Sequence, residues 1–139
     1  MRDILFRGKT YNDKWVQGLL VQMDDRLTQI RKLGSDGIGY YDYSIVPSTV
    51  GQYTGLTDKN GKKIFEGDAL KIIRKYQSPF DDDTKEYTDI TTDVVFFDDE
   101  GLCFSYGKSP FLCVADNVTA EYEVVGNIHD NPELLEVTE

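Results

Sequence analysis

Two cysteines and one histidine are the residue types in this chain that most often carry nucleophilic or metal chemistry. A cysteine beside a histidine base forms a nucleophile, but Cys103 and Cys113 both stand in apolar, strand-like segments. Small buried hydrophobes are the more common role for cysteines in such segments. Together with His129, the sole histidine, they do not supply the four ligands of a zinc site convincingly. The sequence therefore predicts no catalytic residues, no metal and no cofactor, and we expect no enzymatic activity.

Carboxylate oxygens are more plentiful, because acidic residues gather in two short runs. Residues 81–83 (Asp-Asp-Asp) and 98–100 (Asp-Asp-Glu) could offer ligands to calcium. Neither run matches a helical calcium loop, and the Asp58-Lys-Asn-Gly turn fails because Lys62 stands where a ligand is needed. Acidic runs of this kind are more typical of solvated loops, which is the interpretation that we prefer to a calcium site.

Charge separates two hypotheses about binding partners. The chain carries 25 acidic residues against 15 lysines and arginines, a net charge of −10, which opposes broad contact with nucleic-acid phosphates. A local basic surface would be the exception, and it gives the alternative hypothesis of nucleic-acid binding, with Tyr53 or Phe65 stacking on bases. The basic residues that form this candidate binding surface cluster in the sequence and flank tight turns: Lys59, Lys62, Lys63, Lys71, Arg74 and Lys75.

The elements that must position these residues are β-strands. Nine Tyr and seven Phe favour strands, and short apolar segments alternate with turn signals. We expect strands over residues 4–9, 15–23, 26–33, 38–46, 50–54, 69–73, 90–97, 102–106 and 111–114, and a strand or a brief helix over 118–125. Asn131 as N-cap and Pro132 at the first helical position predict a short C-terminal helical turn. The predicted fold is mainly β, a small antiparallel barrel-like or SH3-like architecture with an N-terminal meander.

Turn signals concentrate in residues 53–68. The Asn60-Gly61 pair predicts a hairpin because both residues tolerate positive φ, and a Gly-Asp pair predicts a second reversal a few residues later. Between the two reversals, Ile64 and Phe65 are the apolar anchors. The glycines lack the lysine and hydroxyl pattern of a phosphate-binding loop. They are better interpreted as positions where the backbone turns. The residues of this predicted structural turn are Gly55, Asn60, Gly61, Gly67 and Asp68.

The length of 139 residues suits a single domain over residues 1–139. If that domain subdivides, we expect an N-terminal meander over 1–50 and a barrel-like part over 51–139. Two cysteines suit a reducing compartment, and the sequence shows neither a signal peptide nor an apolar run of membrane length, so we expect a cytoplasmic protein. A homo-oligomer is plausible because paired edge strands bury backbone groups.

Three segments of the chain resemble the YopX family of phage and prophage proteins. The opening Met1-Arg-Asp-Ile-Leu-Phe-Arg-Gly-Lys with Trp15-Val-Gln-Gly, the long stretch over residues 50–68 and the ending over 125–135 are each similar to family motifs. The resemblance spans essentially the whole chain and implies a small, predominantly β, intracellular protein of phage or prophage origin. The family has no established activity, so the resemblance implies no catalytic residues. Ala69 departs from the pattern, since a larger aliphatic residue is usual there.

These observations lead to a first hypothesis of a non-enzymatic interaction module. Its acidic surface would bind an unknown host or phage protein, in one variant by imitating nucleic acid. Neither the composition nor the resemblance points to a membrane partner.

Overall fold

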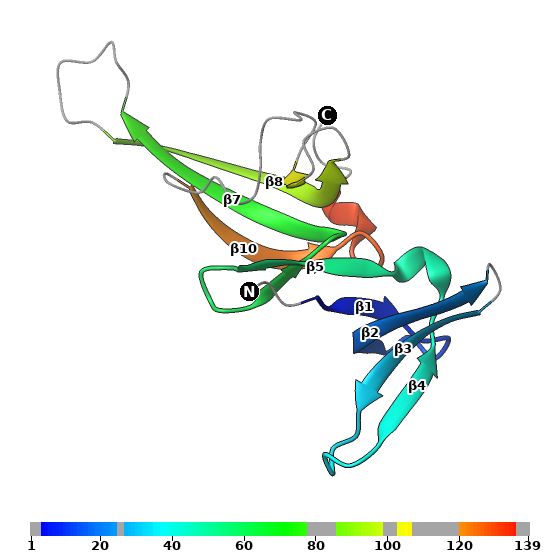
Figure 1. Cartoon of the computed structure of the whole chain (residues 1–139). Coiled ribbons are helices and arrows are strands. Elements are labelled where there is room, and N and C mark those ends of the chain that lie inside the picture. The colour runs from blue at the N-terminus through cyan, green and yellow to red at the C-terminus, as the bar shows by residue number, and fades with distance from the viewer. Residues whose placement is uncertain (1–3, 25–26, 78–85, 99–102, 107–119, 136–139) are drawn as a thin grey trace. The chain divides into compact units, whose positions relative to one another are not determined.

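The structure is a computed structural model that describes residues 4–24, 27–77, 86–98, 103–106 and 120–135 (Figure 1). Strands make up most of these residues, as the sequence predicts. The chain divides into two compact units, Met1–Gly55 and Leu56–Glu139. The strand predicted at 111–114 and the acidic run at 81–83 lie outside the described residues.

In the first unit, strands β1 to β4 form an antiparallel meander, and β5 pairs with β1. Its strands lie in the order β4-β3-β2-β1-β5, and β5 runs on into the second unit, where β6 follows it in the same sheet. Leu20 of β2 lies opposite Ile30 of β3, which lies opposite Tyr43 of β4, so these three residues share one face. The bounds are β1 Phe6–Lys9, β2 Trp15–Asp24, β3 Leu27–Leu33, β4 Tyr40–Ser44, the 3-10 helix η1 Pro47–Thr49 and β5 Gly51–Thr57.

The core of the first unit is small and apolar. Val16, Ile30 and Ile45 are buried together, and further apolar residues pack against them. An isolated bridge joins Thr10 to Ile45, which brings the chain after β4 back to the end of β1. Gly8 makes this approach possible, because a Cβ at that position would collide with the Ile45 side chain.

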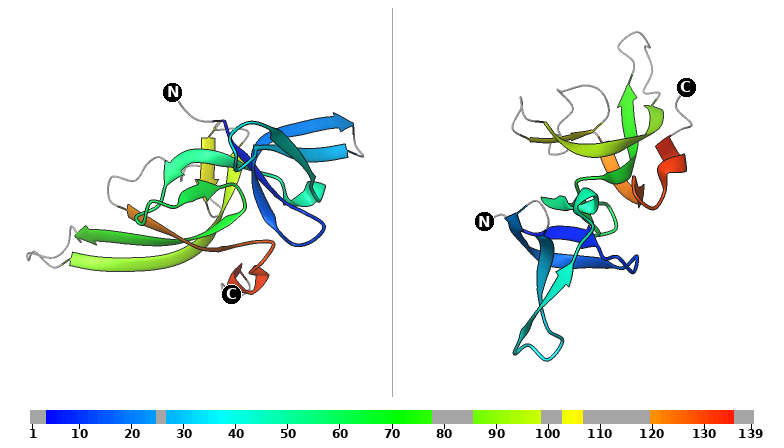
Figure 2. Two further views of the ribbon diagram at one scale, coloured as in Figure 1. Left: turned by 90° about the horizontal axis from the view of Figure 1, so that it is seen from below. Right: turned by 90° about the vertical axis from the view of Figure 1, so that its right-hand side faces the viewer.

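The second unit holds a four-stranded antiparallel sheet in the order β10-β7-β8-β9 (Figures 1 and 2). Alternate residues of β7, Leu70 and Ile72, enter a core with Ile64, Val95 and Tyr122. The predicted anchor Ile64 is thus confirmed, and Phe65 beside it is also buried. The bounds are β6 Lys63–Phe65, β7 Asp68–Gln77, β8 Glu86–Asp98, β9 Cys103–Tyr106, β10 Ala120–Asn127 and the 3-10 helix η2 Pro132–Leu135.

The mainly β, antiparallel prediction is confirmed, but the predicted barrel is wrong. The strands of the described residues form two open sheets and no closed barrel. In the first unit, the Thr10–Ile45 bridge is isolated, and β1 pairs with β2 and β5 instead of with β4. A closed barrel requires a continuous ladder around its circumference, so one bridge leaves the sheet open.

The C-terminal segment agrees with one of its predicted forms over 118–125, a strand, and differs from the prediction after it. Residues that we expected to be a strand or a helix form β10, and the expected helical turn is reduced to the four-residue 3-10 helix η2. The Oδ1 of Asn131, the predicted N-cap, accepts the Asn127 N–H four residues earlier, at 3.4 Å. The Asn127 Oδ1 itself accepts the N–H groups of His129 and Asp130, each at 2.9 Å. An asparagine-centred turn at Asn127 therefore leads into η2.

The described part of the chain contains no helix with the length and apolar character needed to traverse a bilayer.

Candidate functional site

The predicted structural turn is built on glycines in the left-handed region. Gly55, Gly61 and Gly67 have φ values of 89°, 82° and 93°, which glycine adopts without steric cost. The Gly67 N–H donates to the Val95 carbonyl at 2.9 Å, and its own carbonyl accepts the Ile128 N–H at 3.0 Å. Gly61 and Gly67 lie in turns, whereas Gly55 has its positive φ inside strand β5.

Two buried carboxylates hold the same segment together. The Asp68 Oδ2 accepts the Phe65 N–H at 2.7 Å across the second reversal. The Asp58 Oδ1 accepts the N–H groups of Asn60 and Lys62, each at 2.9 Å, and its Oδ2 accepts the Val124 N–H at 2.9 Å. Asp58 thus joins the hairpin after β5 to strand β10.

The hydrogen bonds to Asp58 keep its carboxylate ionised. Burial, the largest single influence, raises the pKa, but the backbone N–H groups of Val124, Lys62 and Asn60 and the Lys62 charge together outweigh it, so the pKa of Asp58 is lowered. This role was missed in the sequence, where Asp58 stood out only as the start of a failed calcium loop. An Asp two residues before an Asn-Gly pair is nevertheless an Asx-turn signal, which could have indicated the local half of the arrangement.

Strand alternation divides the basic cluster between two faces of the second sheet. Successive side chains of a strand point to opposite faces, so Lys71 and Lys75 of β7 lie on one face and Arg74 lies on the face of Leu70 and Ile72. The six predicted residues therefore do not form one patch.

Acidic residues also stand beside several of these cations. Lys71 lies directly opposite Glu123 of β10, and the Lys59 Nζ is 3.6 Å from the Glu123 Oε2. Arg74 lies directly opposite Asp89 of β8. Cross-strand pairs of opposite charge are mutually stabilising, so part of the positive charge is balanced within the sheet.

The predicted stacking aromatics are not available at the surface. Tyr53 is 7% exposed and Phe65 is 2% exposed, whereas stacking on a base requires an open ring face. Lys62 and Lys63 are exposed at the hairpin. The basic candidate surface thus keeps exposed lysines but loses the aromatic platform that we expected beside them.

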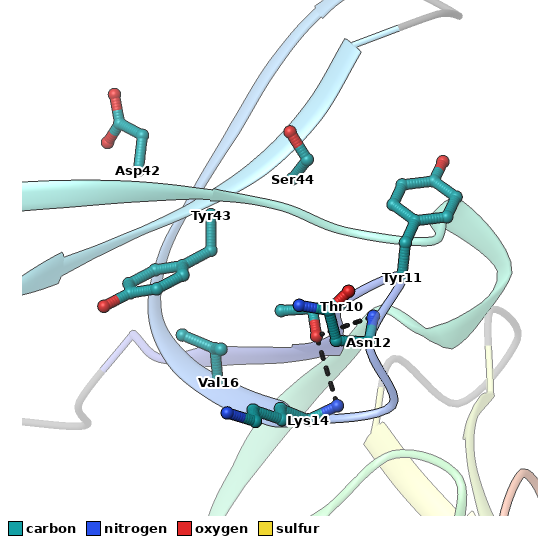
Figure 3. A pocket seen from close by; sticks show the side chains of 8 residues that line it. All are labelled: Thr10, Tyr11, Asn12, Lys14, Val16, Asp42, Tyr43 and Ser44. Atoms are coloured by element: carbon teal, nitrogen blue, oxygen red, sulfur yellow. Dashed lines mark hydrogen bonds between the residues drawn. The ribbon is translucent and has the colours of Figure 1, made fainter.

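A second candidate site, which the sequence did not indicate, is a hollow of about 380 Å³ in the first unit (Figure 3). One wall is the turn between β1 and β2, held by the Thr10 Oγ1, which accepts the N–H groups of Asn12 and Lys14 at 3.3 and 3.1 Å. The other wall is the end of β4. The lining residues are Thr10, Tyr11, Asn12, Lys14, Val16, Asp42, Tyr43 and Ser44.

The side chains of the hollow combine an apolar floor with polar rims. Val16 belongs to the core of the unit, and the Tyr43 ring hangs over it from β4 in Figure 3. Consecutive residues of β4, which point to opposite faces, line the hollow, so it follows the edge of that strand. A volume above about 300 Å³ with an apolar floor and a few polar groups is typical of binding sites.

Strand β4 presents an unusual concentration of tyrosines. Tyr40, Tyr41 and Tyr43 are 66%, 54% and 39% exposed. Between them, Asp42 makes a bidentate ion pair with Arg31 of β3, with Nε–Oδ1 and Nη2–Oδ2 distances of 2.8 and 3.1 Å. The Arg31 hydrogen bond, the largest cause, lowers the pKa of the Asp42 carboxyl. Tyrosine rings on a rigid strand are well suited to protein contact, because they bring a large area at a small entropic cost.

The structure bears on the metal hypotheses only in part. Among these residues, no group of three or more His, Cys, Asp or Glu side chains could hold a metal ion. Cys113 and the acidic residues 81–83 and 99–100 lie outside the described ranges. The pairing of a cysteine with His129 and the binding of calcium by the two acidic runs therefore stay untested.

Comparison with known proteins gives a family and a fold. No curated protein matches the chain. The crystal structure of protein EF1440 from Enterococcus faecalis is similar to it, at 26% sequence identity and a TM-score of 0.52, over 97% of this chain and 99% of that chain. The YopX protein family matches residues 5–136, which takes in almost the whole sequence and confirms the resemblance of its motifs. The chain therefore belongs to the YopX protein family.

Proposed function

We propose that this YopX protein is a non-enzymatic interaction module of phage or prophage origin that binds a host or phage protein. The origin rests on what the family resemblance implies. The observation that carries the binding role is the hollow of the first unit, where Tyr11 and Tyr43 stand on opposite walls above the apolar floor of Val16. An extended segment of a partner would place an apolar side chain on that floor and polar groups against the rims.

The distribution of charge supports the same surface. Met1–Gly55 contains seven lysines and arginines and six acidic residues, a net charge of +1. Leu56–Glu139 contains eight lysines and arginines and 19 acidic residues, a net charge of −11. The acidic character thus belongs to the second unit. Protein surfaces of either sign can approach a nearly neutral unit without long-range repulsion, so the first unit suits contact with protein, and the second suits contact with a basic partner.

A pull-down from host lysate at low and high salt tests the proposed binding role. We expect a partner that the wild-type chain captures, and we expect the Tyr11→Ala/Tyr43→Ala double variant to capture about tenfold less of it, since tyrosines dominate many interfaces. Tyr87→Ala is the matched control, because Tyr87 and Tyr43 are each 39% exposed but Tyr87 lies in the second unit. Recovery of no partner at either salt, or equal capture by all three chains, would count decisively against the proposal.

Nucleic-acid binding, the alternative, has a direct test of its own. Because the cations of β7 divide between two faces and Lys59 is paired with Glu123, we expect no retardation of a short single-stranded oligonucleotide in a gel-shift experiment at low salt. Retardation that is lost in a Lys62→Ala/Lys63→Ala variant would reinstate the alternative, with the exposed hairpin as its contact surface.

A further inference from the structure

The hairpin after β5 carries an asparagine followed by a glycine at its exposed tip. Residues 59–63 are all exposed, and a Cβ built on Gly61 would meet no heavy atom within 4 Å. None of the hydrogen bonds found among the described residues involves the Asn60 side chain. Asparagine is a thermally labile residue, and a glycine after it lets the backbone come close to the side-chain amide. The tip of the hairpin therefore has the composition and the room for a reaction between these two neighbours.

That reaction is the deamidation of Asn60. The Gly61 nitrogen loses its proton and forms a bond to the Asn60 Cγ, the bond from Cγ to Nδ2 breaks, and ammonia leaves with the proton. Water then opens the succinimide ring that remains. Opening at Cγ gives aspartate, whereas opening at the backbone carbonyl gives isoaspartate, in which the main chain passes through Cγ. The net reaction consumes water and releases ammonia, and it needs no oxidant, metal or enzyme.

The closed hairpin opposes the first step at the Gly61 nitrogen. The Gly61 N–H donates to the Asp58 carbonyl at 3.0 Å, and this hydrogen bond must break before the nitrogen can attack. The Asp58 Oδ1 also accepts the N–H groups on either side of Gly61, those of Asn60 and Lys62, each at 2.9 Å. A carboxylate at this place disfavours a second negative charge on the nitrogen between them. Asp58 therefore keeps Asn60 from reacting while the hairpin is closed.

The other asparagines of the described segments lack this combination of features. Asn131 is followed by Pro132, whose nitrogen has no hydrogen to lose and cannot close the ring. The side-chain oxygen and nitrogen of Asn127 are both engaged in hydrogen bonds. Asn12 is followed by an aspartate, whose side chain hinders the approach. Asn60 is thus the position at which deamidation is expected, and the chain supplies its own internal controls.

We propose that Asn60 is a site of spontaneous deamidation that reacts when the hairpin held by Asp58 opens. Isoaspartate adds a backbone atom to the turn, so that the N–H groups of residues 60 and 62 no longer both reach the Asp58 Oδ1. Because Asp58 also accepts the Val124 N–H at 2.9 Å, the modified hairpin loosens its attachment to β10. The reaction is irreversible and marks chains whose hairpin has opened, and it does not depend on the proposed interaction role.

Peptide mapping of the full chain after incubation in mildly alkaline buffer tests the proposal. In denaturant, where the hairpin is open, we expect Asn60 to become a mixture of aspartate and isoaspartate at least about tenfold faster than in the folded chain. Asn131 should stay unchanged in both conditions. Equal rates of conversion in the folded and the denatured chain, or no conversion of Asn60 in denaturant, would overturn the proposal.

Asp58→Ala tests whether Asp58 holds the hairpin closed. We expect the folded variant to deamidate at Asn60 at least about tenfold faster than folded wild type, because the open hairpin is more populated. Asp36→Ala is the matched control, since the Asp36 Oδ1 also accepts a backbone N–H in a turn, from Ile38 at 3.0 Å, but in the first unit. A folded Asp58→Ala chain that reacts no faster than wild type would remove Asp58 from the proposal.

Low concentrations of urea supply a measurement that needs no variant. Opening the hairpin exposes much less surface than global unfolding, so the rate of deamidation in wild type should rise less steeply with urea than the unfolding constant does. Equal slopes would show that Asn60 reacts only in the unfolded chain and would overturn the local opening. Faster amide exchange at Val124 in the separated isoaspartate form, with Asn60→Asp as the control for charge alone, would confirm the loosened attachment to β10, whereas unchanged exchange would refute it.

Discussion

Asp58→Ala is expected to destabilise the second unit by about 3 kcal/mol, because it removes a charged acceptor from three backbone N–H groups. The three donors are those of Asn60, Lys62 and Val124. Water can replace part of the loss at the exposed hairpin, but Val124 is partly buried in β10. Denaturant unfolding measures the total cost, and amide exchange at Val124 shows whether β10 loosens first.

Asp58→Asn is the matched variant that separates the two hairpin hydrogen bonds from the hydrogen bond to Val124. Its Oδ1 keeps the two bonds to the hairpin, and its amide nitrogen places a donor against the Val124 N–H. We expect about half of the loss seen in Asp58→Ala, with the change in exchange centred on β10. A stability equal to wild type in both variants would contradict the role assigned to Asp58.

The lowered pKa of Asp58 also predicts an acid-dependent stability. Because the folded pKa lies below the unfolded value of about 3.9, the stabilisation is fully present above that value. It is lost as the pH falls through the folded pKa, since the unfolded chain then binds the proton more readily. Unfolding free energies measured from neutral pH to below about pH 4 should fall more steeply for wild type than for Asp58→Asn.

Gly18→Ala has the second largest expected effect. A Cβ on Gly18 would collide with the Arg31 carbonyl oxygen, and it would lie 3.0 Å from the Arg31 carbonyl carbon and 3.1 Å from the Ile30 Cγ2. The main obstacle is backbone of the paired strand β3, which cannot move without giving up its ladder to β2. We expect a loss of about 3 kcal/mol in the free energy of unfolding, measured by denaturant unfolding.

Gly39→Ala is the control for Gly18→Ala in the same unit. A Cβ at Gly39 would meet no heavy atom within 4 Å, and Gly39 does not have a positive φ. Its substitution should change stability by less than about 0.5 kcal/mol. Equal melting temperatures for the two variants would show that β2 and β3 are not as close at Gly18 as the structure places them.

The family and the strands could be predicted because they depend on local or long sequence signals. Alternating apolar residues with turn signals predicted β1 to β5 to within three residues at each end, although the short strand β6 was missed. The resemblance to YopX motifs was confirmed over residues 5–136. The glycine turns could be predicted equally well, since a positive φ is a property of one residue and its neighbours.

The barrel prediction failed because closure is not a local property. Strands of the right length and number do not by themselves show which edges meet. Here the residues that follow β1 and β4 meet at the isolated Thr10–Ile45 bridge, beside the hydrogen bond from the Val46 N–H to the Lys9 carbonyl. The same applies to the hollow, whose two walls, the Thr10–Lys14 turn and the end of β4, are brought together by that connection.

The sequence alone determined that this protein is mainly β, acidic and related to YopX proteins, and it located the turns. Tertiary structure alone decided what its charged residues do. The register of β7 sends Lys71 and Arg74 to opposite faces, and Asp58 finds its third donor in Val124, 66 residues away. The reason is physical: backbone dihedral angles are set by neighbouring residues, whereas strand register and the partners of a buried carboxylate depend on segments that only folding brings together.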